Sequence, residues 1–242
     1  MTGTATSSRL PREPSTRVLR LDVDAIVLDI DDTLYLERDY VRSGFDTVGT
    51  WVSSQLGLEG FGTLAWAAFE AGLRHRIFDE VLKSCGHAPD PSLIEEMVAH
   101  YRNHSPVIAL APDARTALDR WHGRVALAAI TDGPLVSQQT KATTLALDAW
   151  VQPIVFTAAL GSGMGKPHPA AFELVQEQLG VEGRRCVYVA DNPSKDFIAP
   201  KKLGWQAVRV RRPLGLHARA AGGADVDFEI SSLDYLDCLP AQ

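Results

Sequence analysis

Three aspartates stand within four positions in the stretch VLDIDDTLY, residues 27–35. Asp29, Asp31 and Asp32 directly follow the apolar residues 25–28, which have the composition of a buried strand. Carboxylates gathered at the end of a strand repel one another and raise one another's pKa values unless a cation neutralises them. Mg²⁺ prefers oxygen ligands and is usually held by one or two carboxylates together with a phosphate. The stretch therefore predicts a divalent-cation site, with Mg²⁺ as the cofactor.

Other polar residues follow the later strand-like segments of the chain. In open parallel sheets, ligands bind outside the carboxyl ends of the strands, so residues at these positions are expected to meet. They are Thr131, Asp132 and Gly133 after residues 124–130, Lys166 in GKPHP ahead of the helix that follows residues 153–156, and Asp191, Asn192 and Asp196 after residues 185–190. Four separated segments thus supply carboxylates, a hydroxyl group and a lysine to one predicted site.

These residue types are suited to phosphoryl transfer. A bound Mg²⁺ would screen an incoming phosphate from Asp29, so that its carboxylate could attack phosphorus as a covalent nucleophile. Asp31 stands two residues later, where it could protonate the leaving oxygen and afterwards activate water. Thr131 and nearby backbone N–H groups would hold the phosphoryl oxygens, and Lys166 would offset their negative charge.

The elements that would position these residues form an alternating pattern. Strand-like segments cover residues 25–30, 124–130, 153–156, 185–190, 206–210 and 226–230, and helical patterns cover 135–147, 169–180 and 194–204, the last interrupted at Pro200. Nearly continuous apolar strands that alternate with helices predict a parallel sheet covered on both faces. We therefore expect an α/β fold with a doubly wound, Rossmann-like core.

One interval breaks the alternation. Residues 41–104 carry apolar residues at helical spacing and contain no convincing strand. We interpret them as an all-helical cap domain inserted into a core made of residues 21–40 and 105–242. Inserts at the carboxyl end of a strand often serve as lids over a site. Residues 1–20 are rich in Thr, Ser and Pro and are predicted to form a flexible tail.

Composition limits the classes of partner. The 242 residues carry a net charge of −6, so no general attraction to nucleic acid or anionic lipid is expected. No apolar run approaches the ~20 residues of a membrane span. The three cysteines are far apart in the chain, which argues against a disulfide framework and suggests a cytoplasmic protein. The one basic stretch, residues 209–219, is predicted to be a solvated loop.

The motifs resemble those of the haloacid dehalogenase-like (HAD) hydrolase superfamily. DIDDT is similar to the D-x-D-x-T signature, and the ordered set of Thr131, Lys166 and ADNPSKD is similar to the other three motifs. The resemblance covers residues 24–239, and the helical insert stands where the family has its C1 cap. Two residues depart from the usual pattern, because Asp32 and Ala190 stand where glycine is often found. Neither change removes a reacting group.

The resemblance also implies roles for individual residues. Asp29 would be the nucleophile and Asp31 the acid and base, and Mg²⁺ would be bound by Asp29, the Asp31 backbone carbonyl and Asp191. Asp196 and Asn192 would lie just behind the metal ligands, where Asp196 would orient those ligands or pair with Lys166. Because dehalogenation needs no proton on the leaving halide, Asp31 favours a phosphatase over a dehalogenase.

The function predicted on these grounds is a Mg²⁺-dependent phosphatase acting on a small phosphorylated metabolite. Sugar phosphates, nucleotides and phosphoglycolate-like acids are the candidate substrates, and we expect substrate contacts from Asp132, Gly133 and His168. Three alternatives stand beside it: a phosphomutase with the same nucleophile, a catalytically silent HAD-like protein that binds a ligand, and a phospho-accepting receiver domain. The last fits poorly, since the third strand-like segment ends in Phe156-Thr157-Ala158, without a carboxylate.

Overall fold

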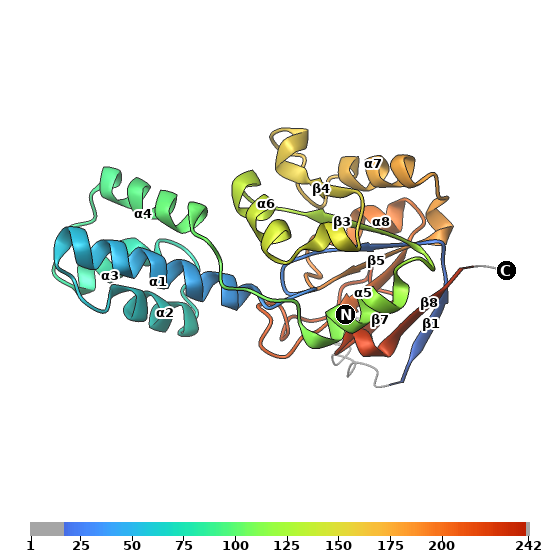
Figure 1. Ribbon diagram of the computed structural model, residues 1–242, viewed down its shortest axis with the longest axis horizontal. Helices are drawn as coiled ribbons and strands as arrows, with labels where there is room; N and C mark the ends of the chain where they lie inside the picture. The colour runs from blue at the N-terminus through green and yellow to red at the C-terminus, as the bar shows by residue number, and fades with distance from the viewer. Residues whose placement is uncertain (1–16, 241–242) are drawn as a thin grey trace, which may run out of the picture.

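The computed structural model describes residues 17–240 and contains a six-stranded parallel sheet (Figure 1). The strand order is β4-β3-β2-β5-β6-β7. The bounds are β2 Ala25–Leu28, β3 Ala126–Thr131, β4 Ile154–Phe156, β5 Cys186–Ala190, β6 Gln206–Val210 and β7 Phe228–Ile230. β2 lies between β3 and β5, and all three run in the same direction. The residues that follow these three strands are therefore neighbours at one edge of the sheet.

Helices cover both faces of the sheet. They are α5 Pro112–Trp121, α6 Leu135–Thr144, α7 Ala170–Leu179 and α8 Ile198–Lys202, with short 3-10 helices at Leu147–Ala149, Thr157–Leu160, Gly183–Arg185 and Leu233–Tyr235. Ile26 and Leu28 of β2 pack with Trp121 of α5 on one face. Ala25 and Val27 pack with residues of α7 and α8 on the other. This alternation confirms the predicted doubly wound α/β core.

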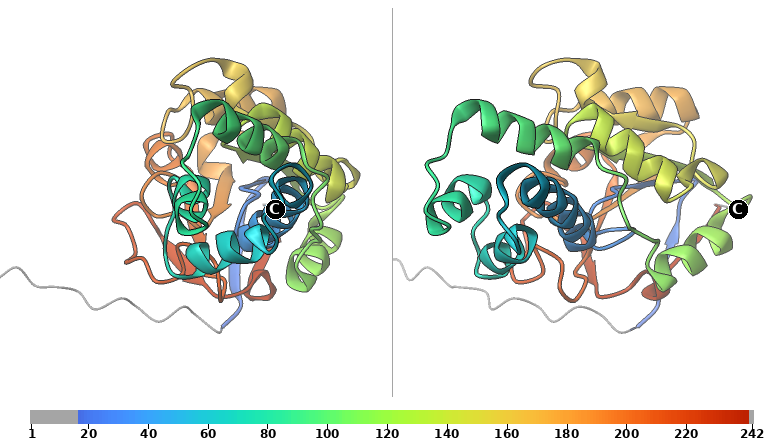
Figure 2. Two further views of the ribbon diagram at one scale, coloured as in Figure 1. Left: turned by 90° about the vertical axis from the view of Figure 1, so that its left-hand side faces the viewer. Right: turned by 60° about the vertical axis from the view of Figure 1, so that its left-hand side comes forward.

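A helical insert separates β2 from β3. It consists of α1 Glu37–Leu56, α2 Phe61–Glu70, α3 Ile77–Ser84 and α4 Pro91–Asn103, and has its own apolar cluster around Phe45, Phe61 and Met97. The insert projects from one side of the core, and the turned views show its helices in front of that side (Figures 1 and 2). α1 begins at Glu37, inside the segment 21–40 that the sequence assigned to the core.

Two short strands were not predicted. β1 Leu19–Asp22 pairs in parallel with β8 Leu236–Leu239, with Leu19 opposite Leu236 and Leu21 opposite Cys238. The prediction of a flexible tail is therefore wrong for Leu19 and Arg20, and its residues 1–16 lie outside the described part of the chain. The predicted break at Pro200 is also wrong. Pro200 is the third residue of α8, where a backbone N–H would have no partner within the helix anyway.

The basic stretch is held by internal contacts rather than solvated as predicted. Arg209 is fully buried; it pairs with Glu229 at 2.8 Å and donates from Nε to the Asp191 carbonyl. Arg212 pairs with Asp113 and donates to the Thr33 carbonyl at 2.6 Å. These two arginines tie down the loops that follow β5 and β2. No helix in residues 17–240 is long and apolar enough to cross a membrane.

Candidate active site

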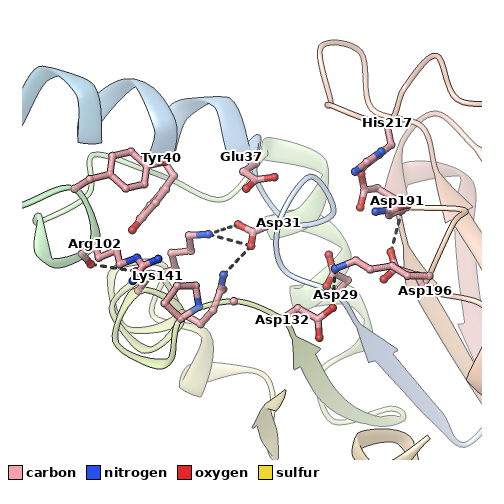
Figure 3. Close-up of a pocket in the computed structure, with 17 residues that line it drawn as sticks. Asp29, Asp31, Glu37, Tyr40, Arg102, Asp132, Lys141, Asp191, Asp196 and His217 are labelled. Atoms are coloured by element: carbon pink, nitrogen blue, oxygen red, sulfur yellow. Dashed lines mark hydrogen bonds and ion pairs between the residues drawn. The ribbon is translucent and has the colours of Figure 1, made fainter. Parts of the chain in front are cut away.

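A pocket of about 340 Å³ opens between the carboxyl edge of the sheet and the insert (Figure 3). Seven of the residues predicted for the site line it: Asp29, Asp31, Asp132, Gly133, Asp191, Asn192 and Asp196. Two more, Thr131 and Lys166, lie behind this lining with 1% and 7% of their surface exposed. The fold thus brings together residues that are up to 167 positions apart, as expected for the ends of adjacent parallel strands.

The carboxylates of Asp29, Asp191 and Asp196 form a compact acidic cluster. One oxygen of each lies within 4.8 Å of the others, and all three residues are buried. Burial and the neighbouring carboxylates raise the pKa of Asp191 to about 9. Burial also raises the pKa of Asp29 to about 7, although Lys166 acts in the opposite direction. A buried set of oxygen donors with excess negative charge suits a hard dication such as Mg²⁺.

Asp29 and Asp191 of the predicted ligand set lie in this cluster, and the Asp196 carboxylate lies beside them. The pairing of Asp196 with Lys166 that the resemblance implied is present, and which residues hold a metal stays a prediction. The backbone N–H of Asn192 donates to the second oxygen of Asp196 at 2.9 Å. Asn192 therefore fixes Asp196 through its main chain, and its side-chain oxygen accepts bonds from Ser194 instead.

Lys166 lies beneath the cluster. Its Nζ is 2.6 Å from Asp29 Oδ1, 2.9 Å from Asp196 Oδ1 and 3.0 Å from the Tyr188 hydroxyl. Burial by itself would lower the pKa of Lys166, but attraction by Asp196 and Asp29 outweighs it and raises that pKa well above its usual value. The lysine is therefore charged, and it neutralises part of the acidic cluster.

The side chain of Asp31 has different partners. Its two oxygens lie 2.7 and 3.0 Å from Lys141 Nζ on α6, Gln138 Nε2 donates to it at 3.0 Å, and the Tyr35 hydroxyl donates as well. Burial raises the pKa of Asp31, but Lys141 and the other donors more than compensate and lower it overall. Two aspartates separated by one residue are thus held in distinct surroundings: Asp29 lies in the acidic cluster with Lys166, and Asp31 lies outside that cluster against Lys141.

A family model described as haloacid dehalogenase-like hydrolase matches residues 23–204. The chain belongs to this family of hydrolases. It is 26% identical over 222 residues to a glyceraldehyde 3-phosphate phosphatase of Methanocaldococcus jannaschii, covering 88% of this chain and 95% of that one. It is 30% identical over 154 residues to a phosphoserine phosphatase of Thermus thermophilus, covering 63% and 60% of the two chains.

A solved structure shares the fold of this HAD-like hydrolase. The putative HAD-hydrolase YfnB of Bacillus subtilis, whose structure is described as bound to magnesium, superposes with a TM-score of 0.62. The two sequences are 16% identical, and the match covers 88% of this chain and 96% of that one. At this identity the likeness concerns the fold alone.

The loop after β3 is fixed by one ion pair and two hydrogen bonds to Asp132. Asp132 accepts from Lys195 Nζ at 2.6 Å, from Thr157 Oγ1 at 2.9 Å and from the Lys166 backbone N–H at 3.1 Å. Its predicted substrate contact stays a prediction, since the carboxylate lines the pocket but is already bound by protein donors. Gly133 has φ +133°, and a Cβ there would lie 2.7 Å from Gln138 Nε2. Only glycine leaves room for Gln138 at this position.

His168 does not reach the pocket, so its predicted contact with substrate is corrected. Its side chain is exposed, and Nδ1 accepts a hydrogen bond from the Ala170 backbone N–H at 3.2 Å, at the start of α7. Although His168 is only two residues from Lys166 in the sequence, Lys166 is buried and His168 is exposed.

Residues from the insert and from the loop after β6 complete the pocket of the HAD-like hydrolase. Glu37 and Tyr40 come from α1, Tyr101 and Arg102 from α4, and His217 from the loop after β6 (Figure 3). Sequence reasoning did not assign them to the site. Arg102 is one of several arginines in the insert, and nothing in the sequence distinguishes it from the others.

The acidic cluster makes a prediction about stability and pH. The folded state raises the pKa of Asp191 from 3.8 to about 9, so above pH ~4 the metal-free folded chain holds a proton that the unfolded chain releases. The contribution of Asp191 to stability is therefore full at low pH and is lost as pH rises towards 9. The Asp191→Asn variant does not lose stability in this way, because asparagine does not ionise. With a chelator present, we expect the melting temperature of the variant to rise relative to that of the wild type between pH 5 and pH 8.

Added Mg²⁺ should reverse that order. If the cation binds only the folded state, a concentration about 100-fold above its Kd raises the unfolding free energy of the wild type by about 2.7 kcal/mol. Asp191→Asn should gain much less. Thermal scans at pH 5, 6.5 and 8 with chelator or Mg²⁺ check both statements, and a constant difference between the two proteins at every pH would contradict them.

Proposed function

We propose that this HAD-like hydrolase is a Mg²⁺-dependent phosphatase that hydrolyses a small phosphomonoester through a phospho-aspartate on Asp29. The observation that carries the proposal is the position of the Asp29 carboxylate, which lines the pocket within 4.8 Å of two further carboxylates. The membership of the family and the two phosphatases among the similar chains support it.

Asp29, Asp191 and Asp196 would hold the metal. When bound there, Mg²⁺ would offset the mutual repulsion of the carboxylates and the charge of an incoming phosphate. A carboxylate oxygen of Asp29 attacks phosphorus, a new O–P bond forms, and the ester P–O bond breaks with its electron pair going to the leaving oxygen. Lys166, charged and 2.6 Å from Asp29, offsets negative charge on the phosphoryl oxygens.

Asp31 exchanges the proton. Its carboxyl group faces the pocket, and the negative charge of a bound phosphate would favour the protonated form, which Lys141 disfavours in the free protein. That proton passes to the leaving oxygen. In the second half of the cycle a water molecule attacks the phospho-aspartate, its proton passes to the Asp31 carboxylate, and inorganic phosphate leaves. The Asp29 carboxylate is thereby restored.

We further propose that the insert is a cap that selects the leaving group. Arg102 supports this, because it lines the pocket and its guanidinium makes no hydrogen bond or ion pair with any residue between 17 and 240, whereas Lys141 and Lys195 are paired with Asp31 and Asp132. A cation without a protein partner at the cap side of the pocket suits a substrate that carries a carboxylate besides its phosphate.

Replacing Arg102 tests this selectivity. A hydrogen bond to a charged group is worth about 1.5–3 kcal/mol, so Arg102→Met should raise KM about 10-fold or more for a phosphoglycolate-like acid. KM for an ester with an uncharged leaving group should change little. The exposed Arg124 lies outside the pocket, and Arg124→Met is the matched control. An equal change in KM for both ester classes would exclude a carboxylate contact.

The proposed activity itself is tested by a screen. The purified protein is incubated with p-nitrophenyl phosphate and a broad panel of metabolite phosphomonoesters, with Mg²⁺ or with a chelator, and released inorganic phosphate is measured. We expect hydrolysis with Mg²⁺ that stops when the metal is removed. Absence of turnover on every ester would reject the phosphatase, and an isomerised ester in place of free phosphate would identify a mutase.

A further inference from the structure

The carboxyl group of Asp31 is held by two side chains of α6 to which no role has yet been assigned. We propose that Lys141 and Gln138 are positioning residues that keep this carboxyl group on the leaving-group side of the pocket and out of the acidic cluster. The inference rests on the proposed phosphatase function. It adds two residues to the machinery and assigns them to one of its steps, proton transfer to the leaving oxygen.

Lys141 is fixed by its surroundings. Its side chain is 4% exposed, its Nζ bonds both oxygens of Asp31, and the same Nζ lies 4.2 Å from the centre of the Tyr40 ring on α1. A buried lysine–aspartate pair costs desolvation and adds little stability compared with well-packed apolar side chains. Its presence beside the proposed acid and base, in the wall of the pocket, is therefore better explained by what it does to Asp31.

Gln138 connects Asp31 to Thr131, the last residue of β3. Its Oε1 accepts from Thr131 Oγ1 at 2.9 Å, and its Nε2 donates to Asp31 Oδ2 at 3.0 Å. Because the hydroxyl of Thr131 donates to the amide oxygen, the amide nitrogen is left to face Asp31. Gln138 and Lys141 are three residues apart and both buried, so one face of α6 presents both donors.

The consequence for the reaction depends on the leaving group. As the O–P bond to Asp29 forms and the ester P–O bond breaks, the leaving oxygen gains an electron pair and takes a proton from Asp31. An alkoxide is a poor leaving group and needs that proton, whereas p-nitrophenolate leaves readily without it. A misplaced Asp31 should therefore slow the cleavage of alkyl phosphates and spare p-nitrophenyl phosphate.

The experiment compares kcat/KM for p-nitrophenyl phosphate and for the best alkyl phosphate found in the screen. This ratio reports the steps up to departure of the leaving group and is insensitive to later hydrolysis of the phosphoenzyme. Since a positioned general acid contributes about 10²–10⁴-fold, we expect Lys141→Met to lower kcat/KM for the alkyl ester about 100-fold and for p-nitrophenyl phosphate less than about 3-fold. Gln138→Met removes no charge. It should also lower kcat/KM more for the alkyl ester than for p-nitrophenyl phosphate, but by a smaller factor.

Lys201→Met is the matched control, because Lys201 also forms a lysine–aspartate pair, at 2.7 Å with Asp227, but outside the pocket. This variant should have the same kcat/KM as the wild type for both esters. The positioning role would be overturned if Lys141→Met and Gln138→Met lowered kcat/KM equally for both esters, or if they did not lower kcat/KM for the alkyl ester. If the wild type cleaves neither ester, the proposed phosphatase itself has failed, which is a different result.

Discussion

Asp29→Asn is expected to lower kcat for any phosphomonoester by about 10⁴-fold or more, since removal of a covalent nucleophile is among the largest losses that one substitution causes. An amide oxygen can still accept from Lys166, 2.6 Å away, so the local packing is preserved. The amide does not form the acyl phosphate. Activity is measured with p-nitrophenyl phosphate in Mg²⁺, and the acid-quenched wild type is examined by mass spectrometry for a phosphorylated Asp29 peptide.

The fold of Asp29→Asn should remain intact. Burial raises the pKa of Asp29 from 3.8 to about 7, so its contribution to stability is full at low pH and is lost as pH rises through 7. Asparagine does not ionise, so the variant does not lose stability in this way as pH rises. This gain partly offsets the stability lost through its weaker hydrogen bond to Lys166. The exposed Asp148 serves as a control, and Asp148→Asn should behave as the wild type. Substantial turnover by a folded Asp29→Asn protein would end the proposal of a phospho-aspartate.

The core of the site could be predicted from the sequence because its residues follow strands. β2 and β5 are apolar throughout and buried throughout, so their ends could be located to within a residue or two. In a parallel sheet the ends of neighbouring strands coincide, and Asp29 and Asp191 had to approach each other once β2 and β5 paired. Lys166 was placed by its resemblance to a family motif, and its contacts agree with that placement.

The partners of Asp31 could not be predicted in the same way. Asp31 stands two residues from Asp29, and the resemblance gave the two carboxylates different roles without indicating which side chains hold Asp31. The difference arises from Gln138 and Lys141, which are 107 and 110 positions away. The sequence contained one indication of these partners: Gln138 and Lys141 are spaced to share one face of the helix that directly follows Thr131-Asp132-Gly133.

Short elements were also beyond the reach of sequence patterns. β1 has four residues, LRLD, of which only Leu21 is buried, and its polar residues resemble those of the preceding segment. It is a strand because β8 pairs with it from the other end of the chain. The arginines of residues 209–219 look solvated by composition, yet Arg209 is buried because Glu229 and the Asp191 carbonyl receive its donors. In each case a distant partner decided the outcome.

Lys166→Met should damage both catalysis and stability. The variant leaves Asp29 and Asp196 without their cation, and breaking a buried pair by removing one partner typically costs about 3–5 kcal/mol. Buried carboxylates without a partner become protonated, so the loss in the metal-free protein should be larger at pH 8 than at pH 5. Because a charged group that stabilises the transition state is also removed, kcat should fall about 10²–10³-fold even with Mg²⁺.

The two effects of Lys166→Met can be separated by Mg²⁺. A dication in the acidic cluster replaces the missing positive charge for Asp29 and Asp196, so saturating Mg²⁺ should restore much of the unfolding free energy, measured by urea denaturation. It should not restore kcat, because Lys166 would act on the phosphoryl oxygens independently of the metal. Lys202→Met, at an exposed lysine of α8, controls for loss of one positive charge. Recovery of kcat together with stability would mean that Lys166 serves only to neutralise the carboxylates.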